Sequence, residues 1–321
     1  MKIDFNLSDL ISALDLVSIV NPNPVTGPNN AAGYLFVVRG NECSLYARGE
    51  ETVSRANFKL ISSDGDGSFV FPSENLGASL RPLLKEEETC VIEATSEEGK
   101  YIVNYKTSPD GSEAEFGSFD PNLVSMVDDD LEAANVSHEC SSGVLREALS
   151  LSKPYIADIK SGKADNLMGV EVLDKDRIPK GDGYLYAAEE KSAYYFWSEH
   201  LSGKSLEIHG KHLGSLLNFL SKSSGNVTIR KGKNNTFAVN DQGCVFGWSK
   251  HNKLHDKFNF YTLKRDALVV QVLKTRMLNA LYSTKGIMKK DKVKIKFNFD
   301  SDKQKISFEV PEAKGKSIKV D

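Results

Sequence analysis

The chain has 321 residues, 40% of them hydrophobic and 26% charged, with a net charge of −3. This length and apolar content support several buried cores and predict two or three domains. No stretch reaches the roughly 18 uncharged apolar residues that a membrane-spanning helix needs. Because the first residues alternate as a strand does, they also do not read as a signal peptide. We expect a cytoplasmic protein with no membrane contact, in the host cytoplasm if the protein is viral.

The distribution of charge along the chain and the spacing of its cysteines further limit the class of protein. Residues 258–321 carry 13 Lys and 2 Arg against 5 Asp and 2 Glu, a net charge of +8 that leaves −11 on residues 1–257. Such a basic segment is either a solvated surface or a surface that faces phosphates. Cys43, Cys90, Cys140 and Cys244 are too widely spaced for a Cys-x-x-Cys metal or redox site, which predicts reduced and mostly buried thiols.

One supersecondary pattern, a strand, a helix and then three strands, is repeated along the chain. In the first repeat, strand 2–5 precedes a helix that we expect Ser8 and Asp9 to cap. Turns at 40–41 and 49–50 then separate three strands.

Four further repeats follow in the same order, with Pro82 expected to kink the second helix. The predicted first strands are 68–71, 136–140, 205–209 and 257–261. The predicted helices are 76–84, 144–151, 213–220 and 268–281. The predicted later strands are 90–94, 100–105 and 114–116; 167–173, 183–188 and 193–197; 226–230, 236–239 and 244–248; and 292–299, 305–310 and 317–320. The acidic runs 86–88 and 128–130 are expected in loops.

A single repeat cannot cover both faces of its sheet, so we expect the repeats to pair into α+β domains with two helices on one side. The predicted domains are 1–128, 129–257 and 258–321. The last range holds one repeat only. We therefore expect either that the chain is truncated in this domain or that its assembly closes differently.

Several local stretches, in this order, resemble the bacterial DNA polymerase III beta clamp. They are the opening strand Met1-Lys2-Ile3 with its Leu-rich helix, the segment Phe-Asp-Pro-Asn-Leu at 119–123 before the acidic run, and the fourth repeat. One segment departs from the family. Where those clamps have Thr-Asp-Gly-His-Arg, residues 188–194 read AEEKSAY, which suggests different partner recognition, as in a divergent phage clamp.

The resemblance implies a DNA clamp fold of paired β-α-β-β-β repeats, with helices inside and sheets outside. It implies a processivity factor, not an enzyme and without a cofactor, that encircles double-stranded DNA and tethers a DNA polymerase. The implied partners are the polymerase, a clamp loader and further copies of the chain in a head-to-tail ring, a homodimer if the third domain is complete. Edge strands near Phe69 or Lys100 and near Phe308 are expected to form that contact.

If the chain is such a clamp, cations on the polar faces of the helices would face the DNA phosphates. The first helix is an exception, because it carries Asp9 and Asp15 and no basic residue. The alternative for each cation is an ordinary solvated side chain. The predicted DNA-facing residues are Arg81, Lys85, Arg146, Lys153, Lys160, Lys211, Lys222, Lys264, Arg265, Lys274 and Arg276.

By the same resemblance, a peptide from a partner would enter an apolar pocket. The alternative for each pocket residue is a place in the core. The predicted pocket residues are Leu167, Tyr194, Phe196, Leu254 and Phe258.

Other function classes have less support in the sequence. His209 with His212 and His251 with His255 lack a third metal ligand nearby, and no phosphate-binding Gly-rich loop or nucleophile motif occurs. A hydrolase would require a pocket with clustered carboxylates or histidines. The stronger alternative is a viral clamp-fold accessory factor for replication or transcription that holds DNA by charge without closing a ring.

Overall fold

A computed structural model divides the chain into two compact units, residues 1–260 and 261–321. The described residues are 1–20, 33–72, 76, 80, 81, 89–97, 100–107, 113–124, 128–156, 169–173, 184–188, 193–201, 206–250, 275, 279, 282, 296–300, 305–309 and 317–320. Among these residues, no helix is both long and apolar enough to cross a membrane.

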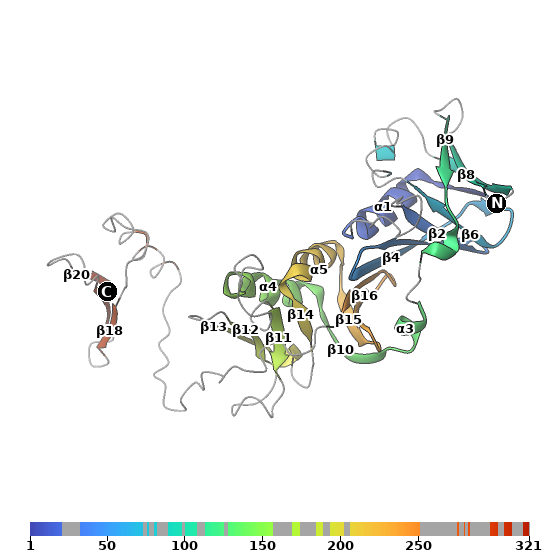
Figure 1. The fold of residues 1–321 in the computed structure, drawn as a ribbon. Coiled ribbons are helices and arrows are strands. Elements are labelled where there is room, and N and C mark those ends of the chain that lie inside the picture. Colours follow the sequence, from blue (N-terminus) through green and yellow to red (C-terminus); the bar gives the residue numbers. More distant parts are fainter. Residues whose placement is uncertain are drawn as a thin grey trace. The chain divides into compact units, whose positions relative to one another are not determined.

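The first two repeats, which hold the amino-terminal end of the chain (Figure 1), exchange their opening strands. The first repeat comprises β1 (Lys2–Asn6), α1 (Leu7–Val17), β2 (Tyr34–Arg39), β3 (Glu42–Arg48) and β4 (Thr52–Lys59). The second comprises β6 (Gly67–Phe71), β7 (Thr89–Glu97), β8 (Lys100–Thr107) and β9 (Glu113–Ser118), with Leu76 and Leu80 helical between β6 and β7. One sheet has the order β5-β1-β7-β8-β9, where β5 is Ser62–Ser63, and the other contains β4-β3-β2-β6. Each opening strand therefore completes the sheet of the other repeat.

The third and fourth repeats exchange strands in the same way. The third comprises β10 (Asn135–Ser141), α4 (Ser142–Ser152), β11 (Gly169–Leu173), β12 (Tyr184–Ala188) and β13 (Ala193–Trp197). The fourth comprises β14 (Glu207–His209), α5 (Gly210–Lys222), β15 (Asn226–Lys231), β16 (Asn235–Asn240) and β17 (Val245–Ser249). Their sheets have the orders β13-β12-β11-β14 and β10-β15-β16-β17. The exchange was not evident from the sequence, because strand periodicity does not specify a neighbouring strand.

One sheet passes from the first two repeats into the next two. Strand β17 pairs antiparallel with β4, which joins the two halves into an eight-stranded sheet of order β10-β15-β16-β17-β4-β3-β2-β6. The pairing places Gly247 opposite Val53 and Phe246 opposite Ser54. The ladder therefore connects residues nearly two hundred positions apart without a gap.

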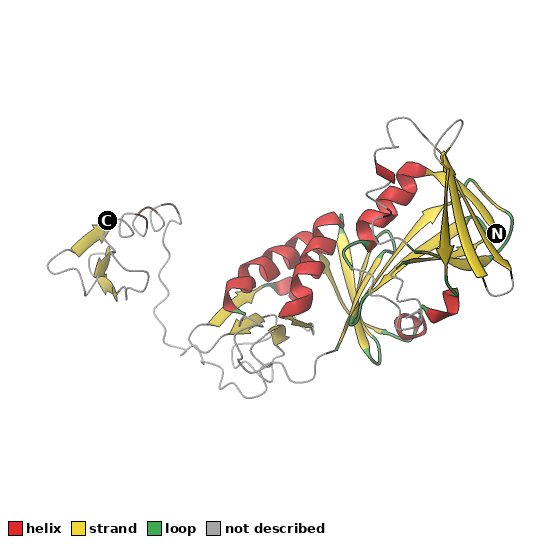
Figure 2. Cartoon of the chain, turned by 45° about the horizontal axis from the view of Figure 1, so that its top comes forward, coloured by secondary structure: helices red, strands yellow, loops and turns green. Residues whose placement is uncertain are grey.

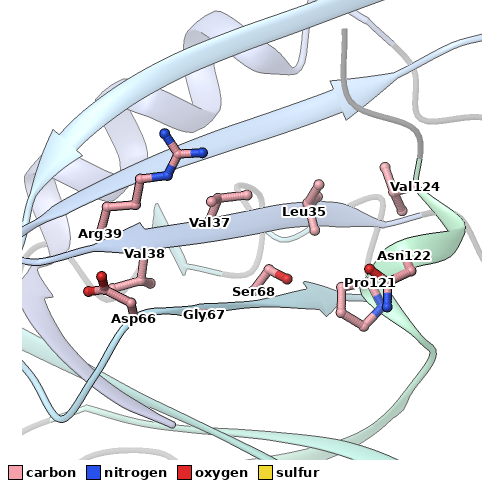
Figure 3. Close-up of a pocket in the computed structure, with 10 residues that line it drawn as sticks. All are labelled: Leu35, Val37, Val38, Arg39, Asp66, Gly67, Ser68, Pro121, Asn122 and Val124. Carbon is pink, nitrogen blue, oxygen red and sulfur yellow. The ribbon is translucent and has the colours of Figure 1, made fainter. Parts of the chain in front are cut away.

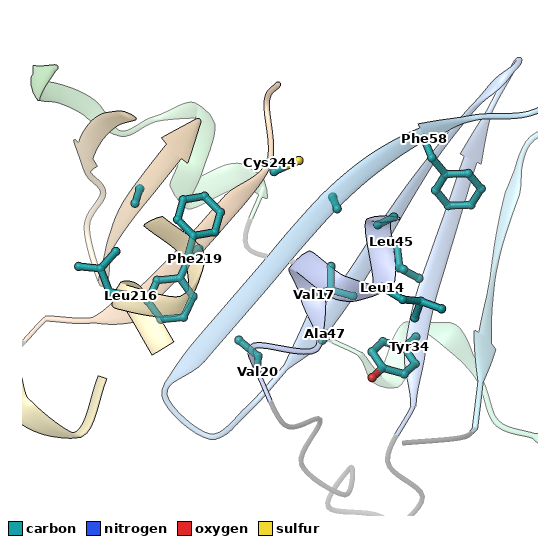
Figure 4. Packing of buried hydrophobic residues seen from close by; sticks show 14 of the residues in the cluster. Leu14, Val17, Val20, Tyr34, Leu45, Ala47, Phe58, Leu216, Phe219 and Cys244 are labelled. Atoms are coloured by element: carbon teal, nitrogen blue, oxygen red, sulfur yellow. The ribbon is translucent and has the colours of Figure 1, made fainter. Parts of the chain in front are cut away.

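The helices pack on one face of these sheets through apolar residues spaced three and four apart (Figure 4). Helix α1 buries Leu7, Leu10, Ile11, Leu14 and Val17, and α5 buries Leu213, Leu216, Phe219 and Leu220. Burial of each such side chain contributes about 1.5–3 kcal/mol relative to exposure. The four cysteines are buried, as predicted.

Three sequence predictions were wrong in detail. They concern the residues that cap α1, the conformation of the run 128–130 and the strands at the sheet edges. Helix α1 begins at Leu7 with Asn6 as its N-cap, so Ser8 and Asp9 lie in its first turn. The run 128–130 opens the short helix α3 (Asp128–Glu132) instead of lying in a loop, and carboxylates are favourable at that end of a helix.

The third correction concerns the expected edge strands. Phe69 does lie on the edge strand β6, but Lys100 lies in β8, which is central between β7 and β9. Phe308 lies in β19 (Lys305–Glu309), which is central between β18 (Lys296–Asp300) and β20 (Ser317–Val320). Among the strands that the structure describes, the edge next to β8 is therefore β9, and the outer strands of the sheet in the second compact unit are β18 and β20.

Candidate nucleic-acid interface

Helices α4 and α5 lie side by side and form a continuous helical face in residues 1–260 (Figure 2). Helix α4 buries Leu145, Ala148 and Leu149, which directs Arg146 into solvent. Lys153 follows directly after α4 and is also exposed. Two predicted DNA-facing cations therefore lie on or next to one exposed helix.

Asp15, one of the two acidic residues of α1, contacts two predicted cations. The carboxylate of Asp15 forms an ion pair with Arg81, and the backbone carbonyl of Asp15 accepts a hydrogen bond from the ammonium of Lys222, in the last turn of α5. Partial burial lowers the pKa of Lys222, and the nearby Arg81 charge lowers it further. Asp15 therefore holds two cations that would otherwise repel each other.

A second ionic contact ties α5 to the turn between β3 and β4. Lys211 forms an ion pair with Glu51, and His212 Nε2 lies 3.2 Å from Glu51 Oε2. The side chain of His212 is only 6% exposed, so this contact is partly inside the protein. Lys211 is thus engaged near the β17–β4 junction, whereas Arg146 and Lys153 point to solvent.

These partners could not be found from the sequence. Arg81 lies 66 positions from Asp15, and Lys222 lies 207 positions from it, so no local spacing signals either contact. The other predicted DNA-facing residues lie outside the described residues and stay predictions: Lys85, Lys160, Lys264, Arg265, Lys274 and Arg276.

Helix α3 is anchored to the first half of residues 1–260 through Asp128. Its carboxylate accepts hydrogen bonds from the Tyr46 hydroxyl at 2.6 Å and from the Arg55 guanidinium at 3.1 Å. Burial and the Asp128 carboxylate together raise the pKa of Tyr46 to about 12. Tyr46 therefore stays protonated as the donor to Asp128 at any ordinary pH.

The same helix is anchored to the second half through Asp130. Its carboxylate accepts the N–H of Lys233 at 2.5 Å, the N–H of Asn235 at 3.0 Å and the side-chain amide of Asn235 at 2.8 Å. A β-carbon on Gly232 would lie 2.5 Å from the Asp130 carboxylate, so glycine is needed for this close approach. Helix α3 therefore bridges the β17–β4 junction with carboxylates on both sides.

Two of the predicted peptide-pocket residues lie on β13. Tyr194 and Phe196 are half-buried and pack against the main core, and the Tyr194 ring stacks on Tyr155 with centroids 5.3 Å apart. Burial raises the pKa of Tyr194, and the nearby Glu147 charge adds to the effect. Leu167, Leu254 and Phe258 lie outside the described residues, so the pocket stays a prediction.

The opposite face of the eight-stranded sheet carries a shallow groove of about 450 Å³ (Figure 3). Leu35 and Val37 point to this face because they alternate with Phe36 and Val38, which pack with α1 in the main core. Its other lining residues are Val38, Arg39, Asp66, Gly67, Ser68, Pro121, Asn122 and Val124. The groove is formed by different strands from those that carry Tyr194 and Phe196.

His209 has a structural position. His209 is the N-cap of α5, and its Nδ1 accepts the N–H of Lys211 at 3.2 Å. Within the part of the chain that the structure describes, no group of three or more His, Cys, Asp or Glu side chains is placed to hold a metal ion. His251 and His255 lie outside that part.

Paired repeats with exchanged opening strands, helices on one face and a sheet continuous between pairs define the sliding-clamp fold. Solved structures with this fold are similar over the whole chain. They include the DNA polymerase III subunit beta from Pseudomonas aeruginosa, with 17% identity, a TM-score of 0.69 and 84% of that chain covered. A putative beta subunit from Eubacterium rectale is 15% identical, with a TM-score of 0.71 and 84% covered.

The Helicobacter pylori beta clamp, solved bound to a DNA ligase peptide, is 13% identical, with a TM-score of 0.68 and 84% of that chain covered. No family model and no curated protein sequence matches the chain. The similarity is therefore one of fold. The predicted resemblance and fold class are confirmed.

Proposed function

We propose that this protein is a DNA polymerase processivity factor, a sliding clamp that encircles duplex DNA and tethers the polymerase to it. The observation that carries the proposal is the continuous eight-stranded sheet that joins two clamp-like pairs of repeats, with the helices α4 and α5 on a common face. The exposed Arg146 and Lys153 give that face positive charge. A protein of this kind has no covalent chemistry and needs no cofactor.

A helical face that slides along DNA must attract phosphates weakly, through contacts that can be exchanged. Lys and Arg contacts to the DNA backbone carry no sequence information, so each contact can be replaced by its neighbour as the protein moves. The ion pair of Asp15 with Arg81 reduces the net charge near the end of α1. Together these features suit a protein that slides rather than one that stays at a site.

The proposed partners are double-stranded DNA, a DNA polymerase, a clamp loader and further copies of the chain in a ring. A polymerase peptide would dock beside Tyr194 and Phe196, together with Leu167, Leu254 and Phe258. A fluorescent peptide from the cognate polymerase should bind with at least tenfold lower affinity to Tyr194→Ala than to the unchanged protein. Equal affinity would remove Tyr194 from the docking site.

The second candidate is a viral accessory factor of replication or transcription that holds DNA by charge without a closed ring. The net charge of +8 on residues 258–321 favours it, because an open protein must hold DNA electrostatically. We place either protein in the cytoplasm, the host cytoplasm for a viral protein.

Retention on DNA distinguishes the two candidates. The protein is loaded with its clamp loader on nicked circular plasmid, which is then cut at one site or left intact. A clamp is retained on the circle and lost from the linear DNA, because it slides off the ends. Equal retention on both forms, abolished by moderate salt, would replace the clamp by the charge-held factor.

Charge reversal of the helical face tests which surface meets DNA. Arg146→Glu with Lys153→Glu should shorten polymerase products several-fold. Arg39→Glu, on the face of the sheet that carries the groove, is the matched control and should leave product length unchanged. Lys211 is avoided because its reversal would also break the ion pair with Glu51. An equal effect of both changes would contradict a DNA-facing helical surface.

A further inference from the structure

Three charged residues from three separate segments meet beside the helices α1 and α5. Asp15 lies near the end of α1, Arg81 lies between β6 and β7, and Lys222 lies in the last turn of α5. The Asp15 carboxylate pairs with the Arg81 guanidinium, and the Asp15 backbone carbonyl accepts a hydrogen bond from the Lys222 ammonium. Two positive charges therefore share one negative charge.

The ion pair of Asp15 with Arg81 is open to solvent. The side chain of Asp15 is 41% exposed and that of Arg81 is 54% exposed. Exposed ion pairs contribute little to stability, because water screens the attraction and two mobile side chains must be ordered. Another anion can therefore displace the Asp15 carboxylate from Arg81 at little cost to the fold.

The two cations lie close enough to affect each other. Partial burial lowers the pKa of Lys222, and the Arg81 charge lowers it further. Two neighbouring cations attract a phosphate, because its negative charge is spread over oxygens that can contact both of them. Asp15 already supplies a carboxylate at the place where such a phosphate would bind.

The cations of helix α4 differ in this respect. Arg146 and Lys153 are exposed, and neither forms an ion pair with a residue that the structure describes. A phosphate can approach these two side chains without displacing a carboxylate. Arg81, in contrast, is reached only in competition with Asp15.

We propose that Asp15 sets the strength of DNA binding, because its carboxylate occupies the Arg81 guanidinium and a DNA phosphate must displace it. This inference rests on the proposed function, in which the helices face duplex DNA. The attraction of a phosphate to Arg81 is partly offset by the ion pair that is lost. The resulting contact is weaker than a contact to an unpaired arginine, so it is exchanged more readily as the protein slides.

Removal of the carboxylate tests this role. Asp15→Asn in the full chain keeps the size of the side chain and the backbone carbonyl that accepts the Lys222 hydrogen bond. In fluorescence anisotropy with a short linear duplex, the variant should bind roughly threefold or more tightly than the parent. The slope of log affinity against log salt should also become steeper by about one, because one more phosphate is neutralised.

Asp9→Asn is the matched control, because it removes the same charge from the same helix. The Asp9 carboxylate accepts a hydrogen bond from the Asn6 side-chain amide at 3.3 Å and forms no ion pair with a residue that the structure describes. This variant should change the affinity by less than about twofold and keep the salt slope of the parent. Equal tightening by Asp9→Asn and Asp15→Asn would overturn the proposal, because net charge alone would then explain the effect.

A double variant identifies the cation that Asp15 occupies. Arg81→Gln should weaken binding roughly threefold or more in the Asp15→Asn background, but by less than about twofold in the parent, where the guanidinium is already paired. The same loss in both backgrounds would show that Asp15 does not compete for Arg81, and would overturn the proposal.

Arg146→Glu with Lys153→Glu, measured in the same assay, separates this inference from the proposed function. If this reversal weakens binding while Asp15→Asn leaves the affinity unchanged, the helices face DNA and the role given to Asp15 is wrong. If neither change alters the affinity, the proposed DNA-facing surface is wrong and the inference falls with it. Thermal unfolding of each variant should match that of the parent, because all the changed side chains are at least partly exposed.

Discussion

At the residue scale, the carboxylates of α3 explain how the two halves of residues 1–260 are held at their junction. Asp128 contacts Tyr46 and Arg55 of the first half, and Asp130 contacts the turn before β16 in the second half. The run 128–130, which the sequence predicted to be a loop, therefore supplies two specific hydrogen-bond acceptors, Asp128 and Asp130.

We predict that Asp130→Asn lowers the free energy of unfolding by about 1–2 kcal/mol at pH 7, because charge-assisted hydrogen bonds to the turn are lost. Partial burial acts to raise the pKa of Asp130, but the hydrogen bonds from Asn235, Lys233 and Asn234 outweigh it and hold the pKa below its usual value. A lowered pKa contributes stability above the unfolded value of about 3.9 and loses it as the pH falls through the folded value. Urea unfolding should therefore show the difference between variant and parent shrinking below about pH 4.

The exposed Asp129 is the matched control for this change, since it lies in the same helical turn. Asp129→Asn should alter the unfolding free energy by less than about 0.5 kcal/mol, as is usual for surface substitutions. A difference between Asp130→Asn and the parent that stayed constant from pH 7 to pH 3 would show that the charge of Asp130 is not what stabilises the turn.

At the scale of elements, the β17–β4 ladder depends on a residue without a side chain. Gly247 lies between Phe237 of the neighbouring strand and Val53 across the junction, and both are buried. Gly117, its equivalent in β9, has open space. The two glycines therefore form a natural comparison between a closely packed position and an open one.

Gly247→Ala should destabilise the fold by about 1–3 kcal/mol, because its β-carbon would force Phe237 and Val53 out of their packing. Gly117→Ala, the same chemical change, should leave the unfolding free energy of the monomer within about 0.5 kcal/mol of the parent. Thermal unfolding at low protein concentration measures both. Equal destabilisation at the two positions would show that the cost comes from the backbone and not from junction packing.

At the scale of the molecule, residues 1–260 form one compact unit although they contain two pairs of repeats. The predicted boundary at 128 falls at the start of α3, and one sheet runs past it through β17 and β4. The two pairs of repeats share the β17–β4 ladder and are both anchored to helix α3. Neither pair is therefore expected to unfold while the other stays intact.

A fragment of residues 1–260 should therefore unfold in a single cooperative transition in differential scanning calorimetry. The calorimetric and van't Hoff enthalpies should agree, which is the mark of two-state unfolding. Breaking the bridge with Asp128→Asn and Asp130→Asn together should lower the transition temperature without splitting it. Two resolved transitions in the unaltered fragment would contradict a shared junction.

The sequence alone determined the repeat, the strand and helix types and the resemblance to the clamps, because these follow from local periodicity and residue order. It also predicted the turn at Gly40, where a φ of 58° suits glycine, and the burial of the four cysteines. Of the site, it indicated Arg146 and Lys153 as polar-face cations. These properties need only neighbours within about one helical turn or one strand.

The tertiary structure alone decided which strands are neighbours and which charges meet. The exchange of β1 and β6, the β17–β4 pairing, and the contacts of Asp15 with Arg81 and Lys222 all join positions far apart in the chain. Such contacts are selected by the packing of the whole sheet and not by any local pattern. For this reason a periodicity that places a residue on a helix or strand does not specify what that residue touches.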